Sequence, residues 1–404
     1  MEKVYKRKKR ANGEGTIRQL SDGRWEARIS DGYTAKGKQH WKTHSSKKQS
    51  DVIKWLNDYK ANRERFCSNT AIKYTMKEWL DIWYDTYVKN NVKVSTRESY
   101  EGIIKNHLVP YIGHIKLLEL KKVEIEKMYD ELLKNGGKKK KLSVKTIRNI
   151  HLVLHKALQE AVQREYIGKN PASIANVPTL KSQNTKKKEI EIYTKSEQEE
   201  LIKVFRTDSV YGIVAICALY TGMRKGELLG LQWDDINFEN KTINVNKQLR
   251  RIKNYEDYET QKTKLSLEYN TKTSNSTRRI SMMPCLVELL SEHRENQQKY
   301  KKIFGKSYNK LDMVFCKENG TPLDPDTVLS KYHKLVAKAG IKVCSFHALR
   351  HTFASRALES KMPAKVVSKI LGHSSVEFTL DTYTHVLPDV QAKELEKLNE
   401  YLNK

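Results

Sequence analysis

The chain has 404 residues, enough for roughly two to four domains that each bury a core of their own. It carries 76 Lys and Arg against 48 Asp and Glu, and because the resulting formal charge of +28 is spread along the whole sequence, a polyanion is the expected partner. No apolar run approaches the roughly 20 residues that span a bilayer, and the five scattered cysteines form no Cys-x-x-Cys pair, so the sequence argues against a membrane partner and favours a reduced, cytoplasmic location.

The first sixty-odd residues predict a small sheet and one helix. Two segments that alternate apolar and polar side chains flank Asp22-Gly23, which is a hairpin turn signal. A third strand is expected around Trp41, and apolar residues recur at helical spacing after Lys47. The basic residues on these strands could be a solvated face, but the basic leader favours DNA, because sheets can enter the major groove and basic arms can follow phosphates. Residues 1–66 are therefore predicted to be a DNA-binding module.

Residues 74–177 predict a domain of four helices. Apolar residues recur at helical spacing in four stretches, which are Met76–Val88, Thr96–Leu108, Val123–Leu133 and Val144–Tyr166. A Gly-Gly-Lys-Lys-Lys-Lys run ending at Lys141 separates the last two, and Asn170-Pro171 closes the domain. A polar linker over residues 178–192 is expected to lead into a third domain, so that two basic domains can clamp a duplex.

The third domain, residues 190–404, carries the candidate chemistry. Within a Thr-Gly-Met-Arg-Lys-Gly-Glu run, Arg224 lies one helical turn before Glu227, close to a glycine-marked helix start. Taken alone, this spacing predicts an exposed ion pair within a helix. A strand follows, and after a polar insertion Lys272 is expected near the tip of a hairpin, where most lysines are merely solvated.

The most informative pattern lies in the last sixty residues. His347 and Arg350 are three residues apart in a predicted helix, so both project from one face, and His373 and Tyr383 follow them. A free tyrosine, with a pKa of about 10, is a poor nucleophile at neutral pH and needs a base or a positive field. A tyrosine hydroxyl beside several cationic donors is what covalent attack on a phosphodiester would require.

The order and the neighbours of these residues resemble the catalytic domain of the tyrosine recombinases, the family of phage and transposon integrases. The family's Thr-Gly-x-Arg-x-x-Glu-Leu-x-x-Leu motif is matched at Arg224, and its Leu-Gly-His is matched at His373. The resemblance implies six catalytic residues, which are Arg224, Lys272, His347, Arg350, His373 and the nucleophile Tyr383. Lys262 and Lys264, in the charged insertion that precedes Lys272, are alternatives for the lysine.

The resemblance covers nearly the whole chain and implies a multi-domain, mainly α-helical fold. Residues 1–66 resemble an arm-type DNA-binding domain made of a three-stranded β-sheet plus a helix. Residues 74–177 resemble a four-helix, SAM-like core-binding domain. Residues 190–404 resemble an α+β catalytic domain of the DNA breaking-rejoining type. The nearest pattern is that of conjugative-transposon integrases.

The chemistry that this resemblance implies is a transesterification. Arg224 and Arg350 would stabilise charge on the non-bridging oxygens, and His373 would position the phosphate. His347 would accept the tyrosine proton, and Lys272 would protonate the leaving 5′-oxygen. The product would be a 3′-phosphotyrosine and a free 5′-hydroxyl. Because the covalent bond keeps the phosphodiester energy, neither ATP nor metal nor another cofactor is expected.

Two other motifs suggest different chemistry and are weaker. Residues 32–39 nearly match a P-loop, but Gln39 replaces the required Ser or Thr and no long helix is expected after it. Cys344, His347 and His351 have the spacing of metal ligands on one helix face, but the arginine beside them would repel zinc. His351 is therefore expected to pack or to form a hydrogen bond.

Taken together, the sequence predicts a site-specific recombinase that integrates and excises a mobile element, a conjugative transposon or a phage, in the bacterial cytoplasm. Its partner would be double-stranded DNA with core-type and arm-type sites, and the resemblance allows an excisionase and a host DNA-bending protein as further partners. The amphipathic tail after Tyr383 would either fold back or, as in related integrases, dock on a neighbour in a homotetramer. The alternatives are a topoisomerase IB-like DNA relaxer and a non-catalytic DNA-binding regulator.

Overall fold

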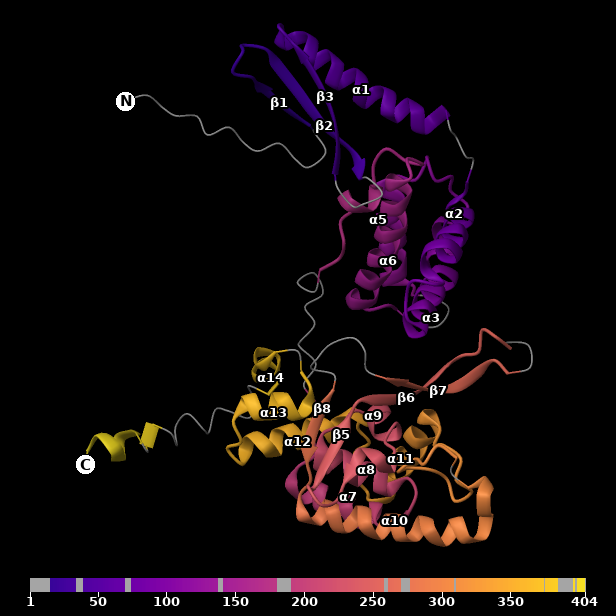
Figure 1. Cartoon of the computed structure of the whole chain (residues 1–404), viewed down its shortest axis with the longest axis vertical. Helices are drawn as coiled ribbons and strands as arrows, with labels where there is room; N and C mark the ends of the chain where they lie inside the picture. The colour runs from indigo at the N-terminus through magenta and orange to yellow at the C-terminus, as the bar shows by residue number, and fades with distance from the viewer. Residues whose placement is uncertain are drawn as a thin grey trace. The chain divides into compact units, whose positions relative to one another are not determined.

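The computed structural model divides into two compact units, residues 1–186 and 187–404 (Figure 1). It describes residues 15–33, 39–69, 74–136, 141–179, 190–257, 261–269, 277–308, 310–373, 375–383, 395–396 and 398–403. The P-loop-like residues 34–38, most of the predicted linker and most of the tail after Tyr383 lie outside these ranges. No described helix has both the length and the apolar character needed to cross a membrane.

The first unit begins with the predicted three-stranded sheet and helix. The elements are β1 (Thr16–Gln19), β2 (Trp25–Tyr33), β3 (Gln39–Ser46) and α1 (Gln49–Asn69). The strands are antiparallel in the order β1-β2-β3, and α1 packs on the sheet (Figure 1). Ala27 and Ile29 of β2 meet Val52 and Leu56 of α1 in a small apolar core, because alternate strand residues face the same side. Gly23, with φ of +83°, makes the predicted hairpin turn.

Helices form the rest of the first unit, and the four predicted stretches are confirmed. The elements are α2 (Met76–Trp83), the π-helical η1 (Tyr84–Val88), α3 (Val94–Ile103), the π-helical η2 (Ile104–Leu108), α4 (Val109–Ile112), α5 (Lys122–Lys134), α6 (Val144–Gln163) and the 3-10 helix η3 (Pro171–Ile174). Thr75 and Ser143 cap α2 and α6 through their side-chain oxygens, and each such cap is worth about 1 kcal/mol. The buried Trp79 indole donates to the Ala157 carbonyl (3.0 Å) and ties α2 to α6.

The strands described in the second unit form two small antiparallel sheets. The first sheet has the order β4-β5-β8 and contains β4 (Ile236–Asn237), β5 (Thr242–Val245) and β8 (Arg278–Ser281). The described residues of the charged insertion before Lys272 belong to a hairpin, whose strands are β6 (Lys247–Lys253) and β7 (Thr263–Tyr269) (Figure 1). At the base of this hairpin Lys247 forms a buried ion pair with Asp235 (2.9 Å).

Helices surround these strands and supply the core. They are α7 (Lys195–Phe205), α8 (Gly212–Thr221), α9 (Lys225–Leu229), the 3-10 helix η5 (Trp233–Asp235), α10 (Pro284–Phe304), the 3-10 helix η7 (Gly305–Ser307), α11 (Pro325–Lys338), α12 (His347–Glu359), α13 (Ala364–Leu371) and α14 (Val376–Tyr383). Nearly every residue of α8 is buried, as expected for a helix that is apolar all round, and α12 packs against it. Gly212 starts α8 where an added Cβ would lie 1.9 Å from the Phe205 carbonyl oxygen.

Gly222 ends α8 in a left-handed conformation, and an added Cβ would lie 2.5 Å from Phe353 and 2.7 Å from Leu371. We expect Gly222→Ala to lower the free energy of unfolding by about 2 to 5 kcal/mol, the sum of left-handed strain and overpacking. Gly340→Ala is the matched control, because Gly340 has φ of +70° and no neighbour within 4 Å of the added Cβ. Denaturant unfolding would compare the two variants, and equal losses would show that the close contacts do not matter.

Candidate active site

Arg224 is the N-cap residue of α9 and does not lie inside the helix. Its backbone N–H donates to Glu227 Oε2 (2.9 Å), and its guanidinium Nη1 donates to Oε1 (2.8 Å). The three-residue spacing lets the Glu227 carboxylate accept this backbone N–H at the start of α9. The interpretation as an exposed ion pair is wrong, however, because the Glu227 side chain is 5% exposed and only that of Arg224, at 44%, reaches the surface.

Glu227 can be buried because a second arginine also binds its carboxylate. Arg278, on β8, donates from Nη2 to Glu227 Oε2 (2.8 Å) and from Nη1 to Oε1 (3.1 Å). Burial alone would raise the pKa of Glu227, but the two arginines outweigh it and lower the pKa to about 2. The carboxylate is therefore charged at neutral pH and holds Arg224 in place.

Arg350 lies on α12 and is buried between the ends of two other helices. Its Nη1 donates to the Gly222 carbonyl (2.8 Å) at the end of α8, and its Nη2 donates to the Leu371 carbonyl (2.7 Å) at the end of α13. The last carbonyls of a helix lack partners within it and carry partial negative charge, so they compensate the buried guanidinium. Burial, helped by the charge of Arg224, lowers the pKa of Arg350 to about 9, which leaves it protonated at neutral pH.

His373 follows the left-handed Gly372 that ends α13. Its Nδ1 forms a hydrogen bond with Thr379 Oγ1 (2.8 Å) on α14, and its ring packs edge-on against Phe378. Burial, with smaller contributions from Arg350 and Arg224, lowers the pKa of His373 to about 4. The imidazole is therefore neutral at neutral pH.

Tyr383 is the last residue of α14, and it is 1% exposed. Its hydroxyl forms a 2.7 Å hydrogen bond with Nδ1 of His351 on α12. Burial raises the pKa of Tyr383 to about 12, although the charge of Arg350 acts in the opposite direction. The phenol is therefore neutral and held by a histidine.

His347 is the first residue of α12, one turn before His351. The two rings pack edge to face, with centroids 4.6 Å apart. Burial lowers the pKa of His347, and the charges of Arg350 and Arg224 act in the same direction. His347 and His351 thus lie on one face of α12, and His351 is the one that bonds to the Tyr383 hydroxyl.

Five of the six predicted residues therefore come together. Lys272 lies in 270–276, outside the residues that the structure describes. Of the two alternatives, Lys264 on β7 pairs with Glu256 (2.5 Å), and Lys262 precedes that strand.

Two residues near the site carried no clear signal in the sequence. His351 was expected to pack or to form a hydrogen bond, and its hydrogen bond to the Tyr383 hydroxyl confirms the second expectation. Arg278 was not singled out, because one arginine in a short basic strand looks like any surface arginine. Only the pairing of β8 with β5, which turns Arg278 inward and Arg279 outward, distinguishes the two.

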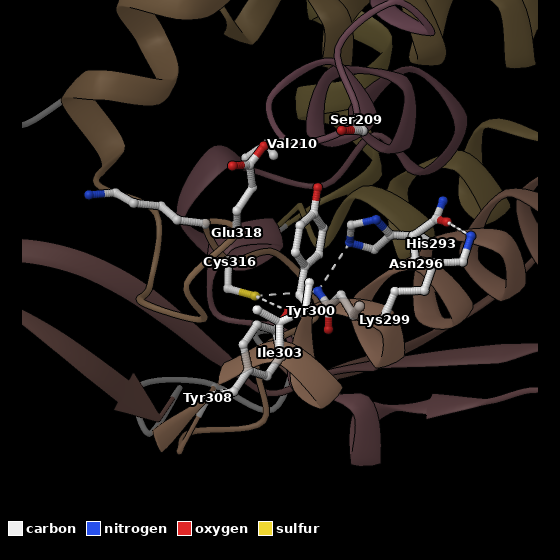
Figure 2. A pocket seen from close by; sticks show the side chains of 12 residues that line it. Ser209, Val210, His293, Asn296, Lys299, Tyr300, Ile303, Tyr308, Cys316 and Glu318 are labelled. Atoms are coloured by element: carbon white, nitrogen blue, oxygen red, sulfur yellow. Dashed lines mark hydrogen bonds between the residues drawn. The ribbon is translucent and has the colours of Figure 1, made fainter. Parts of the chain in front are cut away.

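A cavity of about 370 Å³ lies elsewhere in the second unit, beside α10. Figure 2 shows His293, Tyr300 and Cys316 among the side chains that line it. His293 and Gln297 both bond to the Val314 carbonyl at 2.7 Å, so polar groups at this cavity satisfy one another. None of the five predicted residues that the structure describes lines the cavity.

Comparison with protein families identifies the chain. The model of the phage integrase family matches residues 191–389, and that of the phage integrase N-terminal SAM-like domain matches residues 75–133. A tyrosine recombinase XerC-like protein of Caldanaerobacter subterraneus subsp. tengcongensis is 32% identical over 335 residues, which cover 81% of this chain and 83% of the relative.

Solved structures share the fold. The integrase of the Tn1549 transposon, in complex with transposon right end DNA, is 24% identical with a TM-score of 0.62, over 80% of this chain and 99% of that one. A lambda integrase tetramer bound to a Holliday junction gives 18% identity and a TM-score of 0.54, over 91% of this chain and 97% of that one. The family matches and the extent of the similarity to the XerC-like protein show that the chain belongs to the phage integrase family of tyrosine recombinases and is a site-specific DNA recombinase.

Proposed function

We propose that this recombinase integrates and excises a mobile element by a transesterification in which Tyr383 is the nucleophile. The phenolic oxygen attacks the scissile phosphorus, the bond from phosphorus to the 5′-oxygen breaks, and a 3′-phosphotyrosine and a 5′-hydroxyl result. The observation that carries this proposal is the gathering of Tyr383 with the two arginines Arg224 and Arg350 around the ends of α8 and α13.

The two arginines suit the charge that develops on the phosphate. Attack builds negative charge on the non-bridging oxygens, and fixed cationic donors stabilise it without reorganising. Arg350 is fixed through two of its five N–H groups, and Arg224 through Glu227 and the Gly372 carbonyl (3.3 Å). His373, held by Thr379, completes the phosphate site.

The phenolic proton needs an acceptor, because a tyrosine whose pKa is raised by burial is a poor nucleophile. The resemblance to the tyrosine recombinases implies His347 for this role. The 2.7 Å hydrogen bond instead favours His351 as the first acceptor, with His347 packed against it. In the same proposal Lys272 protonates the leaving 5′-oxygen.

Double-stranded DNA is the proposed partner of all three parts of the chain. Residues 1–66 would bind arm-type sites, while residues 74–177 and 190–404 would bind core-type sites. The charge of +28 supports this, and so does the sheet face opposite α1, where the Arg28 guanidinium lies over the Trp41 ring (4.3 Å). The Tn1549 integrase is described with DNA and the lambda integrase as a tetramer on a junction, so we include a homotetramer held by the tail after Tyr383.

The proposal places the reaction in the bacterial cytoplasm, where the DNA of a mobile element lies; the XerC-like relative is bacterial. An excisionase and a host DNA-bending protein are included as accessory partners. A recombinase joins two specific DNA sites, whereas DNA relaxation needs a single cleavage site, so recombination between two sites distinguishes the two functions.

Replacing the nucleophile tests the class of reaction. The protein would be incubated, without metal or ATP, with nicked DNA from the ends of its element, and denaturant-resistant protein–DNA adducts would be counted. We expect wild type to form an adduct and Tyr383→Phe to form none while still binding DNA, since only the hydroxyl is lost. Tyr401→Phe, at a residue that is 78% exposed, is the control. An adduct in Tyr383→Phe would place the nucleophile elsewhere, and specific binding without any wild-type adduct would favour a regulator.

The proton acceptor can be tested at His351. We expect His351→Leu, which cannot accept a hydrogen bond, to slow adduct formation by about 100-fold or more, as loss of a general base does. His351→Gln keeps an acceptor near the phenol and should retain more of the rate. Single-turnover rates at saturating protein would be compared with those of His347→Gln. A His351→Leu rate equal to wild type would return the role to His347.

The neutral His373 makes stability depend on pH. Its pKa is about 4 in the folded protein against an ordinary value near 6.5, so the unfolded chain binds a proton that the folded one does not. The contribution of His373 to the free energy of unfolding is therefore fully present above about pH 6.5 and is lost as the pH falls toward about 4. We expect a lower melting temperature at acidic pH, with a smaller decrease in His373→Gln. Equal decreases in the two proteins would contradict this linkage.

A further inference from the structure

Arg278 is buried beside the active site, and the mechanism above gives it no task. It lies on β8, and its side chain is 4% exposed. The next residue on the strand, Arg279, is exposed, because alternate residues face opposite sides of a sheet. A guanidinium is costly to bury unless it is fully paired, so the position of Arg278 calls for a physical reason.

The first contact of Arg278 is a two-point ion pair with Glu227. Both η nitrogens donate to the carboxylate, one to each oxygen, at 3.1 and 2.8 Å. The same two oxygens accept from the guanidinium and the backbone N–H of Arg224. The orientation of the Arg224 side chain therefore depends on a carboxylate that Arg278 also binds.

The second contact of Arg278 reaches the end of α13. Three carbonyl groups in a row each accept a hydrogen bond from a different arginine. The pairs are Ile370 with Arg278 Nε (2.5 Å), Leu371 with Arg350 Nη2 (2.7 Å) and Gly372 with Arg224 Nη2 (3.3 Å). The end of a helix suits three cations, because its last carbonyls lack partners within the helix and carry partial negative charge.

We propose that Arg278 is a positioning residue for DNA cleavage. It holds Glu227 and the C-terminal end of α13 in one arrangement, and through them it sets the direction of the two phosphate-binding residues, Arg224 and Arg350. Arg278 does not itself contact the DNA, because its side chain is buried. The inference rests on the phosphate-binding role proposed above for these two arginines.

A purely structural ion pair would stabilise the fold without affecting chemistry, and pH dependence separates the two roles. Burial raises the pKa of Glu227, and Arg278 and Arg224 together oppose it. Without Arg278, Arg224 and the charge of Arg350 still oppose burial, and His347 also faces this carboxylate, but the strongest partner is lost. Glu227 therefore takes up a proton at a higher pH than in wild type. A protonated Glu227 no longer pairs with Arg224, so cleavage should be lost in an acidic range where wild type retains it.

The experiment measures the single-turnover rate of adduct formation on nicked DNA, with the full-length protein in excess. Wild type, Arg278→Met and the matched control Arg279→Met would be compared from about pH 8 to about pH 5.5, with DNA binding and melting temperature measured alongside. We expect Arg278→Met to bind DNA and to cleave about 100-fold more slowly, as loss of alignment does, with a deficit that grows as the pH falls. Arg279→Met should cleave like wild type at every pH.

Two further variants keep the test decisive. In Arg278→Met/Glu227→Gln the titrating carboxyl is absent, so the rate should stay low while the extra pH dependence disappears. If Arg278→Met does not fold, Arg278→Lys retains one charge without the two-point geometry and should fold and cleave at an intermediate rate.

Wild-type rates at all pH values in Arg278→Met, or in Arg278→Lys where the first does not fold, would overturn the positioning role. The proposed function would stand in that case, provided that Tyr383→Phe still formed no adduct. If wild type itself formed no adduct on its own DNA ends, the proposed function would fail, and this inference with it.

Discussion

Burying several guanidinium groups in one place is the constraint around which the second unit is built. Arg350 and Arg278 are almost completely buried, and the more exposed Arg224 shares Glu227 with Arg278. One buried carboxylate, Glu227, and the carbonyl ends of two helices compensate these charges. Because helix ends supply much of the compensation, the positions of α8 and α13 are tied to the positions of the arginines. The same contacts thus stabilise the fold of this unit and set the geometry of its site.

This arrangement explains why short helices and two left-handed glycines surround the site. Gly222 and Gly372 end α8 and α13, and each turns its carbonyl toward an arginine. Gly222 has no room for a side chain against Phe353. Glycine is required there for its backbone conformation and for close packing together, which is why a Thr-Gly-x-Arg run leads into the site.

The proposed nucleophile lies in the same environment but is neutral. The Tyr383 phenol is neutral, buried and bonded to a histidine, while the arginines proposed to bind phosphate are charged. Burial lowers the pKa of His347 and His373 and raises that of Tyr383, so it favours the neutral form of all three side chains. A bound phosphodiester would supply a negatively charged partner for these arginines.

Local patterns in the chain were sufficient for much of this description. Hydrophobic periodicity predicted the sheet of the first unit and its four helical stretches, because each pattern reports which face of an element is buried. The spacing of Arg224 and Glu227 and the order from His347 to Tyr383 carried the resemblance to the tyrosine recombinases, and that resemblance implied five residues that meet in the structure.

Contacts between distant segments could not be predicted in the same way. The burial of Glu227, the inward turn of Arg278 and the bond between His351 and Tyr383 join positions 32 to 51 residues apart. Charged side chains have no periodic signature that separates a solvated arginine from a buried one. Their roles are decided by the packing of β8, α12 and α13, since a buried charge persists only where the tertiary structure brings its partners to it.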